Sequence, residues 1–313
     1  MESTFDIWRR LAERHLARAH KPLIVVLGPT ASGKTGLSIE AALACGGEII
    51  NADSRQLYRH MDIGTAKITP EEMRGVPHRL LDVLDPREEA TAGWYQVRAL
   101  RAIDAVLARG RVPILVGGSM LYLASVTDSL SLAPDPDPEL RSCLIREYDR
   151  DGGIALYRRL RAIDPETASR IHPHNKPRLV RAVEICALTG STRSRSVPRT
   201  ELRADDARCA YDLLVLGLHV SREELALRIR ARTERMFAAG WVGEVRALLG
   251  QGYTGDDPGM KSCGYREIAR HIRDPMGDAA GLVTEIAAKT RQYAKRQMTW
   301  WKGDQRIVWL RKL

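Results

Sequence analysis

Residues Leu23-Ile-Val-Val-Leu27 are followed directly by Gly28-Pro-Thr-Ala-Ser-Gly-Lys-Thr35. The apolar run is typical of a buried strand, and the residues from Lys34 to Cys45 have the pattern of a helix. A glycine-rich turn between a strand and a helix directs backbone N–H groups inward, at the positive end of the helix dipole. The lysine adds a point charge, and the threonine hydroxyl can hold Mg²⁺. The sequence therefore predicts a polyphosphate-binding loop with a metal-binding Thr35, made of Gly28, Pro29, Thr30, Ala31, Ser32, Gly33, Lys34 and Thr35.

Short apolar runs alternate with helical patterns along much of the chain, as a parallel sheet requires. They comprise Leu23–Leu27, Glu48–Asn51, Leu80–Val83, Val112–Val116, Leu213–Leu218 and Arg306–Leu310. We expect an α/β fold: a P-loop NTPase-like parallel sheet flanked by helices. Residues 5–19 have the pattern of an amphipathic helix, which we expect to pack on the core.

The pattern changes after Ala133-Pro-Asp-Pro-Asp-Pro138, because helical periodicity then continues without a strand signal to about Leu188. A polar stretch from Thr189 to Arg208 follows and predicts an exposed, mobile loop. We therefore expect an inserted all-helical subdomain. The predicted domains are an N-terminal helical extension at 1–20, a catalytic core at 21–132 and 209–313, and the helical insertion at 133–208.

The composition favours an anionic partner. The 313 residues include 49 Lys and Arg against 39 Asp and Glu, a formal charge of +10, so nucleic acid is the first candidate, although solvated helix faces can carry such a surplus. The five cysteines show no metal-ligand or disulfide spacing, and no apolar run has the length of a membrane span. We expect a cytoplasmic, monomeric protein without a membrane partner.

Two residues at predicted strand ends are candidates for chemistry. Asp53 follows the second strand, at the edge of the sheet where ligands bind in open α/β folds. It could act as a general base, hold magnesium through water, or cap the following turn. Ser119, after Gly117 and Gly118, offers a hydroxyl at a helix N-terminus, although it could be a simple helix cap.

A basic segment near the C-terminus, Lys289–Lys302, carries interleaved aromatic residues and no acid. Such a helix could face RNA, because basic side chains bind phosphates and aromatic rings stack on bases. Alternatively, Trp300 and Trp301 could pack in the core and leave a solvated basic face opposite.

Together these motifs resemble the tRNA dimethylallyltransferase (isopentenyltransferase) family of the bacterial type. The resemblance covers nearly the whole chain from about residue 21. The similar segments are Gly28–Thr35, Asp53–Lys67, Pro77–Pro86, Gly117–Leu123, Arg170–Glu184, Lys261–Arg266 and Arg291–Trp300.

This resemblance implies transfer of a dimethylallyl group from dimethylallyl diphosphate to N6 of adenine 37, beside the anticodon of tRNA. Asp53 would then be the base that accepts the proton of the adenine amine. The loop N–H groups, Lys34, Ser119 and Arg228 would stabilise the departing diphosphate, with Mg²⁺ held through Thr35. Arg230 or Arg232 could share the role of Arg228.

The resemblance also implies contacts with the anticodon stem-loop of tRNA, from a base extruded into the site. The residues concerned are Asp53, Ser54, Arg55, Gln56, Ser119, Arg141, Lys176, Pro177, Arg178, Leu179, Val180, Arg181, Lys261, Ser262, Cys263, Gly264, Tyr265 and Arg266. Three other functions would use some of the same features: an ATP-dependent kinase, a transferase that alkylates free AMP or ADP, and a non-catalytic RNA-binding module.

Overall fold

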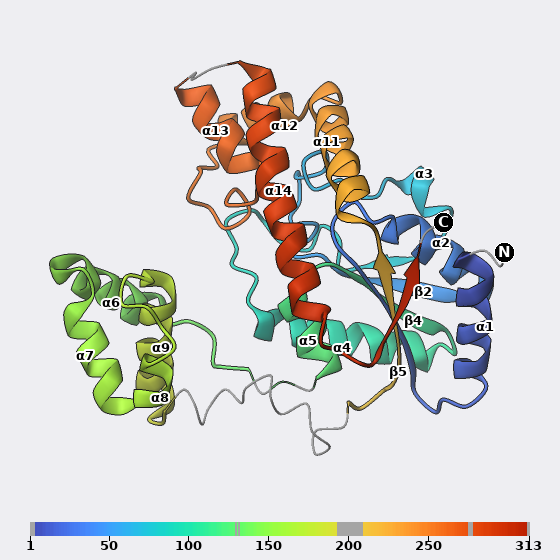
Figure 1. The fold of residues 1–313 in the computed structure, drawn as a ribbon, viewed down its shortest axis with the longest axis horizontal. Helices are drawn as coiled ribbons and strands as arrows, with labels where there is room; N and C mark the ends of the chain where they lie inside the picture. Colours follow the sequence, from blue (N-terminus) through green and yellow to red (C-terminus); the bar gives the residue numbers. More distant parts are fainter. Residues whose placement is uncertain (1–3, 129, 131, 193–208, 275–277, 312–313) are drawn as a thin grey trace. The chain divides into compact units, whose positions relative to one another are not determined.

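Six strands form one parallel sheet in the computed structural model, which describes residues 4–128, 130, 132–192, 209–274 and 278–311 (Figure 1). The order of the strands is β3-β2-β4-β1-β5-β6. Their bounds are β1 Pro22–Leu27, β2 Gly47–Ala52, β3 His78–Arg79, β4 Val112–Gly117, β5 Asp212–His219 and β6 Ile307–Arg311. The predicted parallel α/β fold is confirmed.

The chain separates into two compact units, and the sheet belongs to the unit made of residues 1–90, 97–123 and 210–313. Outside 97–123, the helices of this unit are α1 Thr4–Leu16, α2 Lys34–Cys45, α3 Pro70–Met73, α11 Arg222–Ala238, α12 Trp241–Gly250, α13 Tyr265–Arg273 and α14 Ala279–Trp301. Two more helices, α4 Ala92–Ala108 and α5 Met120–Thr127, lie partly in this unit. The helix predicted after the phosphate loop, from Lys34 to Cys45, has the predicted bounds.

The third predicted strand is wrong. The structure places a short strand at His78–Arg79, where it pairs with Ile49 and Ile50 of β2, whereas Leu80–Val83 is not extended. The physical reason is a backbone reversal: Leu80 has a φ of 61° and Asp82 a φ of 54°. Both angles are left-handed and therefore incompatible with a strand.

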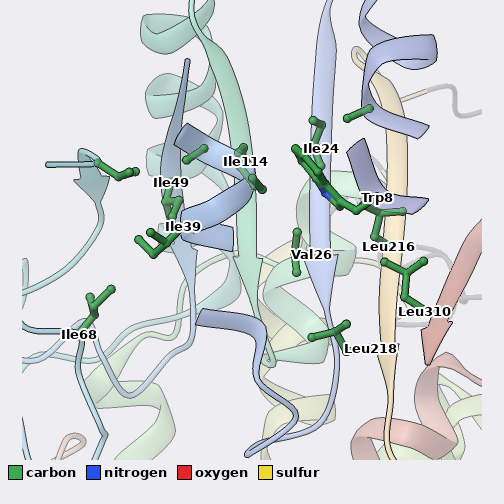
Figure 2. Close-up of a cluster of buried hydrophobic side chains, with 14 residues drawn as sticks. Trp8, Ile24, Val26, Ile39, Ile49, Ile68, Ile114, Leu216, Leu218 and Leu310 are labelled. Carbon is green, nitrogen blue, oxygen red and sulfur yellow. The ribbon is translucent and has the colours of Figure 1, made fainter. Parts of the chain in front are cut away.

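The N-terminal helix packs on the core, as its amphipathic pattern predicts. Trp8 and Ala12 of α1 are buried with Ile24 of β1, Leu216 of β5 and Leu310 of β6 (Figure 2). The indole of Trp8 stacks on Phe5, with the ring centroids 5.7 Å apart. Burying a large aromatic side chain stabilises a fold by about 2–3 kcal/mol, so α1 contributes to the stability of the sheet.

The second unit comprises residues 91–96 and 124–209, of which 193–208 lie outside the described residues. Its helices are α6 Pro138–Asp151, α7 Ile154–Ile163, α8 Pro165–Ala168 and α9 Lys176–Thr189, which confirms the helical pattern predicted after Pro138. The helices share a core that includes Leu144, Leu156, Leu160 and Val183. Most of the loop predicted at 189–208 lies outside the described residues.

Candidate active site

Three strand ends meet at one level of the sheet and bring the predicted site residues together. In the register of the sheet, Gly117 of β4 lies beside Leu27 of β1 on one side and Ala52 of β2 on the other. The next residues along each strand, Gly28, Asp53 and Gly118, therefore begin adjacent loops. A cleft of about 1120 Å³ lies at this edge and is lined by residues of all three loops.

The phosphate loop has the left-handed conformations that its glycines predict. Gly33 has a φ of 94°, and Ala31 adopts the same region with a φ of 63°. A Cβ at Gly28 would lie 2.9 Å from Ser32 Oγ and 3.2 Å from the carbonyl oxygen of Leu218, so this position requires glycine. Thr35, the predicted metal-binding residue, lines the cleft from the first turn of α2.

Cationic groups converge on this loop. Lys34 Nζ donates hydrogen bonds of 2.9 Å to the carbonyls of Gly28 and Pro29. Burial lowers the pKa of Lys34 to about 8, while the nearby Asp53 carboxylate opposes this shift. Burial also lowers the pKa of Arg232, again against the charge of Asp53. Positive groups removed from water attract an anion strongly, which favours a phosphorylated ligand here.

Of the three arginines considered on α11, two face the cleft and one does not. Arg228 lines the cleft, where its Nη1 lies 3.5 Å from the carbonyl oxygen of Ser32 in the phosphate loop. Arg232 also lines it and donates to the carbonyl of Thr65 at 3.4 Å. Arg230 instead pairs with Glu234 on the exposed face of the helix. The spacing i, i+4 of Arg228 and Arg232 is the sequence signal for this shared face.

Asp53 is held in a hydrogen-bonded turn at the end of β2. Its backbone N–H donates to Asn51 Oδ1 at 3.0 Å, and its Oδ1 accepts from the N–H of Arg55 at 2.9 Å. The predicted turn-capping contact is therefore present, and the carboxylate also lines the cleft.

Ser119 supports the turn that carries Asp53. Its Oγ accepts from the N–H of Ser54 at 2.8 Å and donates to Ser54 Oγ at 3.1 Å. The N–H of Ser119 donates to the carbonyl of Ala52, and a Cβ at Gly117 would lie only 2.1 Å from that oxygen. The glycine before the Ser119 loop thus permits this close approach.

A further loop of the cleft, residues 61–67, is fixed by a carboxylate that the motifs do not predict. Glu244 of α12 accepts from the N–H groups of Asp62, Ile63 and Gly64 and from the hydroxyl of Tyr265. In the same loop, the carbonyls of Thr65 and Ala66 accept hydrogen bonds from the side-chain amide of Gln56. Glu244 therefore determines the position of a segment that contacts the residues after Asp53.

Trp241 packs closely against two glycines of different segments. A Cβ at Gly64 would lie 1.9 Å from Trp241 Nε1, and one at Gly264 would lie 2.0 Å from another atom of the same ring. Tyr265 and Phe237 meet the indole edge to face, with centroids 5.6 Å away in each case. The loop 61–67 and the segment Lys261–Arg266 thus both pack against one buried ring.

The segment predicted to bind tRNA at Lys261–Arg266 divides into exposed and buried residues. Lys261, Cys263 and Arg266 are exposed and line the cleft. Ser262 and Tyr265 are buried, so their side chains support the segment rather than present themselves to RNA. Burial and the charge of Glu244 raise the pKa of Tyr265 above its ordinary range, which keeps its hydroxyl a donor.

In the second unit, predicted tRNA-binding residues also fulfil structural roles. Arg141 and Arg181 both pair with Glu184, whose carboxylate is fully buried, at 3.0 and 2.7 Å. About a quarter of each arginine side chain is exposed: 27% for Arg141 and 25% for Arg181. Lys176 pairs with Asp149 at 2.6 Å.

The side chains of Leu179 and Val180, which are predicted to contact tRNA, do not face solvent. Both are buried in the core of the second unit, at 0% and 4% exposed. Their neighbours Pro177 and Arg178, at the start of α9, are exposed. The helical period explains the difference, because Leu179, Val180 and Val183 lie on the face of α9 that packs into this core.

The C-terminal helix α14 buries one of its two tryptophans and partly exposes the other. Trp301 is buried, whereas Trp300 is 37% exposed. Lys289 is paired with Glu267 and Glu285, and the guanidinium of Arg296 lies 5.7 Å from the ring centroid of Tyr293. Tyr293, Arg296 and the buried Gln297 line the cleft. Gln297 is a site residue that sequence reasoning missed, although it lies within the quoted motif Arg291–Trp300.

Proteins of known activity are similar to this chain over most of its length. The tRNA dimethylallyltransferase of Symbiobacterium thermophilum is 44% identical over 298 residues, covering 92% of this chain and 89% of the relative. The crystal structure of the tRNA isopentenylpyrophosphate transferase of Bacillus halodurans matches with a TM-score of 0.67 and 36% identity, covering 93% of this chain and 90% of that one. A eukaryotic dimethylallyltransferase acting on tRNA matches with a TM-score of 0.77 and 28% identity, covering 93% and 74%.

The site combines a phosphate loop at the edge of a parallel sheet with the carboxylate of Asp53 and the buried cations Lys34 and Arg232. These features define a P-loop enzyme that handles a phosphorylated substrate. The sequence model of the family described as IPP transferase matches residues 56–304. The chain therefore belongs to the IPP transferase family and is a tRNA dimethylallyltransferase. This result confirms the resemblance noted in the sequence.

Proposed function

We propose that the cleft at the carboxyl edge of the sheet carries the reaction of this tRNA dimethylallyltransferase, the prenylation of adenine 37. The donor would be dimethylallyl diphosphate, with its diphosphate in the loop Gly28–Thr35 and its allyl carbon towards Asp53. The observation that carries the proposal is the shared level of the ends of β1, β2 and β4, which brings Asp53 and the loop to one cleft.

The proposed reaction forms a carbon–nitrogen bond, breaks a carbon–oxygen bond and transfers one proton. The exocyclic N6 of adenine attacks the allylic carbon while the bond from that carbon to oxygen breaks, and the diphosphate leaves with the electron pair. The proton of N6 passes to the Asp53 carboxylate, since the amine is a poor nucleophile without a base. Lys34, Arg228 and the loop N–H groups offset the charge that builds on the diphosphate. Ser119 holds the turn beside the base.

A divalent cation fits this site only if the substrate supplies oxygens. Among the described residues there is no group of three or more His, Cys, Asp or Glu side chains that could hold a metal ion. Mg²⁺ would therefore be held by the Thr35 hydroxyl together with diphosphate oxygens, with Asp53 nearby in the same cleft. When bound, it would supply neutralising charge for the leaving group.

We further propose that the acceptor is the anticodon stem-loop, bound by a monomer in the cytoplasm. The exposed Lys261, Arg266 and Arg55 at the cleft support an anionic partner larger than a free nucleotide. No helix among the described residues has the length and apolar character needed to cross a membrane.

Replacement of Asp53 by Ala tests the proposal. Loss of a general base should cut turnover by about 10²-fold or more, with the affinity for the stem-loop nearly unchanged. Turnover is followed as label from dimethylallyl diphosphate entering an anticodon stem-loop, with AMP as a competing acceptor and ATP as a competing donor. Glu234→Ala, on the exposed face of α11, is the control. Unchanged turnover of the Asp53 variant would remove the base assignment, and preferred labelling of AMP would remove tRNA as the acceptor.

A further inference from the structure

Gln297 connects two loops of the cleft by a pair of hydrogen bonds. Its side chain is 1% exposed. Its Oε1 accepts from the backbone N–H of Thr30 in the phosphate loop at 3.0 Å, and its Nε2 donates to the carbonyl of Gly118 at 2.7 Å. A Cβ at Gly118 would lie 2.4 Å from that nitrogen, so the glycine is needed to admit the amide. One planar group thereby connects the end of β1 to the end of β4.

The connection continues towards the base. Gly118 immediately precedes Ser119, whose Oγ accepts from the N–H of Ser54, and Ser54 immediately follows Asp53. The phosphate loop and the turn that carries Asp53 are thus related by two hydrogen-bonded links, Gln297 and Ser119. Both links are buried, since Ser119 is 7% exposed.

We propose that Gln297 is a positioning residue that sets the spacing between the phosphate loop and Asp53, an inference that rests on the proposed roles of both. The reaction requires the leaving group on one side of the allylic carbon and the attacking N6 on the other, with the base within reach of the N6 proton. A glutamine suits this task because its amide offers an acceptor and a donor in a fixed plane. A displacement of about 1 Å between reacting groups can cost about 10²-fold in rate, so a small change of spacing is sufficient to slow the reaction.

Two substitutions separate the two hydrogen bonds. Gln297→Met keeps the volume and removes both, whereas Gln297→Glu keeps the acceptor for Thr30 but places an oxygen against the carbonyl of Gly118. We expect both variants to lower kcat by about tenfold to a hundredfold. The KM for dimethylallyl diphosphate and the calorimetric affinity for inorganic diphosphate should change little, because the loss lies in the transition state. Gln305→Met, in the exposed turn before β6, is the matched control and should behave as the parent enzyme.

A double-mutant cycle with Ser119→Ala gives the decisive readout. If both residues act through one chain of contacts, the loss in kcat of the double variant will be far smaller than the product of the single losses. Rates are expressed per folded enzyme, measured by thermal unfolding of each variant. Multiplicative losses, or a fall in diphosphate affinity equal to the fall in kcat, would overturn the positioning role. If Asp53→Ala leaves turnover intact, the proposed function fails; if it cuts turnover while the Gln297 variants keep full kcat, this inference alone fails.

Discussion

Replacing Glu244 by Ala should destabilise the enzyme and slow it, because this one carboxylate accepts four hydrogen bonds. Its Oε2 accepts from Asp62 N at 2.8 Å and Ile63 N at 2.7 Å, and its Oε1 accepts from Gly64 N at 3.2 Å and Tyr265 Oη at 2.6 Å. A hydrogen bond to a charged group contributes about 1.5–3 kcal/mol, so the four together have an upper limit of about 6–12 kcal/mol. Water can reach part of the loop after the substitution, and we therefore expect a net loss of about 3 kcal/mol.

For a unit of this size, about 3 kcal/mol corresponds to a fall of about 6–12 °C in Tm. The assay is thermal unfolding followed by circular dichroism, together with turnover on an anticodon stem-loop. Glu234→Ala is the control, because the pair Arg230–Glu234 is exposed and contributes at most about 0.5 kcal/mol. If Glu244→Ala lowers Tm no more than Glu234→Ala, the carboxylate does not hold the loop 61–67.

Two further predictions concern charge and burial. Burial would raise the pKa of Glu48, but hydrogen bonds from Arg109 and Arg79 outweigh it and hold this pKa below its ordinary value of 4.5. The contribution of Glu48 to stability is therefore fully present above pH 4.5 and is lost as the pH falls through the lower folded pKa. The difference in stability between the parent enzyme and Glu48→Gln, measured by urea unfolding at each pH, should shrink in acid. A difference that stays constant with pH would contradict this prediction. On α9, Arg178→Ala should weaken stem-loop binding and reduce the magnitude of its log–log salt slope by about 1, whereas Leu179→Ala should cost about 2–5 kcal/mol of unfolding free energy. If Arg178→Ala instead destabilised the protein and Leu179→Ala instead weakened stem-loop binding, the assignment of the exposed and buried faces of α9 would be wrong.

The sequence predicts those parts of the fold that depend on local pattern. Five of the strand regions appear where apolar runs predict them, and helix α2 has the predicted bounds because the phosphate-loop motif determines its start. The strand predicted at Leu80–Val83 is absent because Leu80 and Asp82 adopt left-handed backbone conformations, which an apolar pattern does not indicate. Leu80 does not belong to the types that usually mark such turns, glycine, asparagine and aspartate, whereas Asp82 does.

The site follows the same division. The phosphate loop, Asp53 and Ser119 are predicted because each lies in a motif at a strand end. Glu244 and Gln297 are not, since their partners lie far away in sequence: Thr30 is 267 residues from Gln297, and Asp62 is 182 residues from Glu244. Hydrogen bonds across such distances leave no periodic signal along the chain.

The basic residues show how charge in a sequence differs from charge available to a ligand. Arg141 and Arg181 share the buried Glu184, and Lys289 shares Glu267 and Glu285. Each of these cations is already partly neutralised by an acid that the sequence does not place beside it. Because a guanidinium has five N–H donors, Arg141 and Arg181 can keep Glu184 and still donate outward, whereas the single ammonium of Lys289 is held between two carboxylates. The two arginines would thus bind a phosphate backbone more strongly than Lys289 would. The net charge of +10 alone does not distinguish these residues.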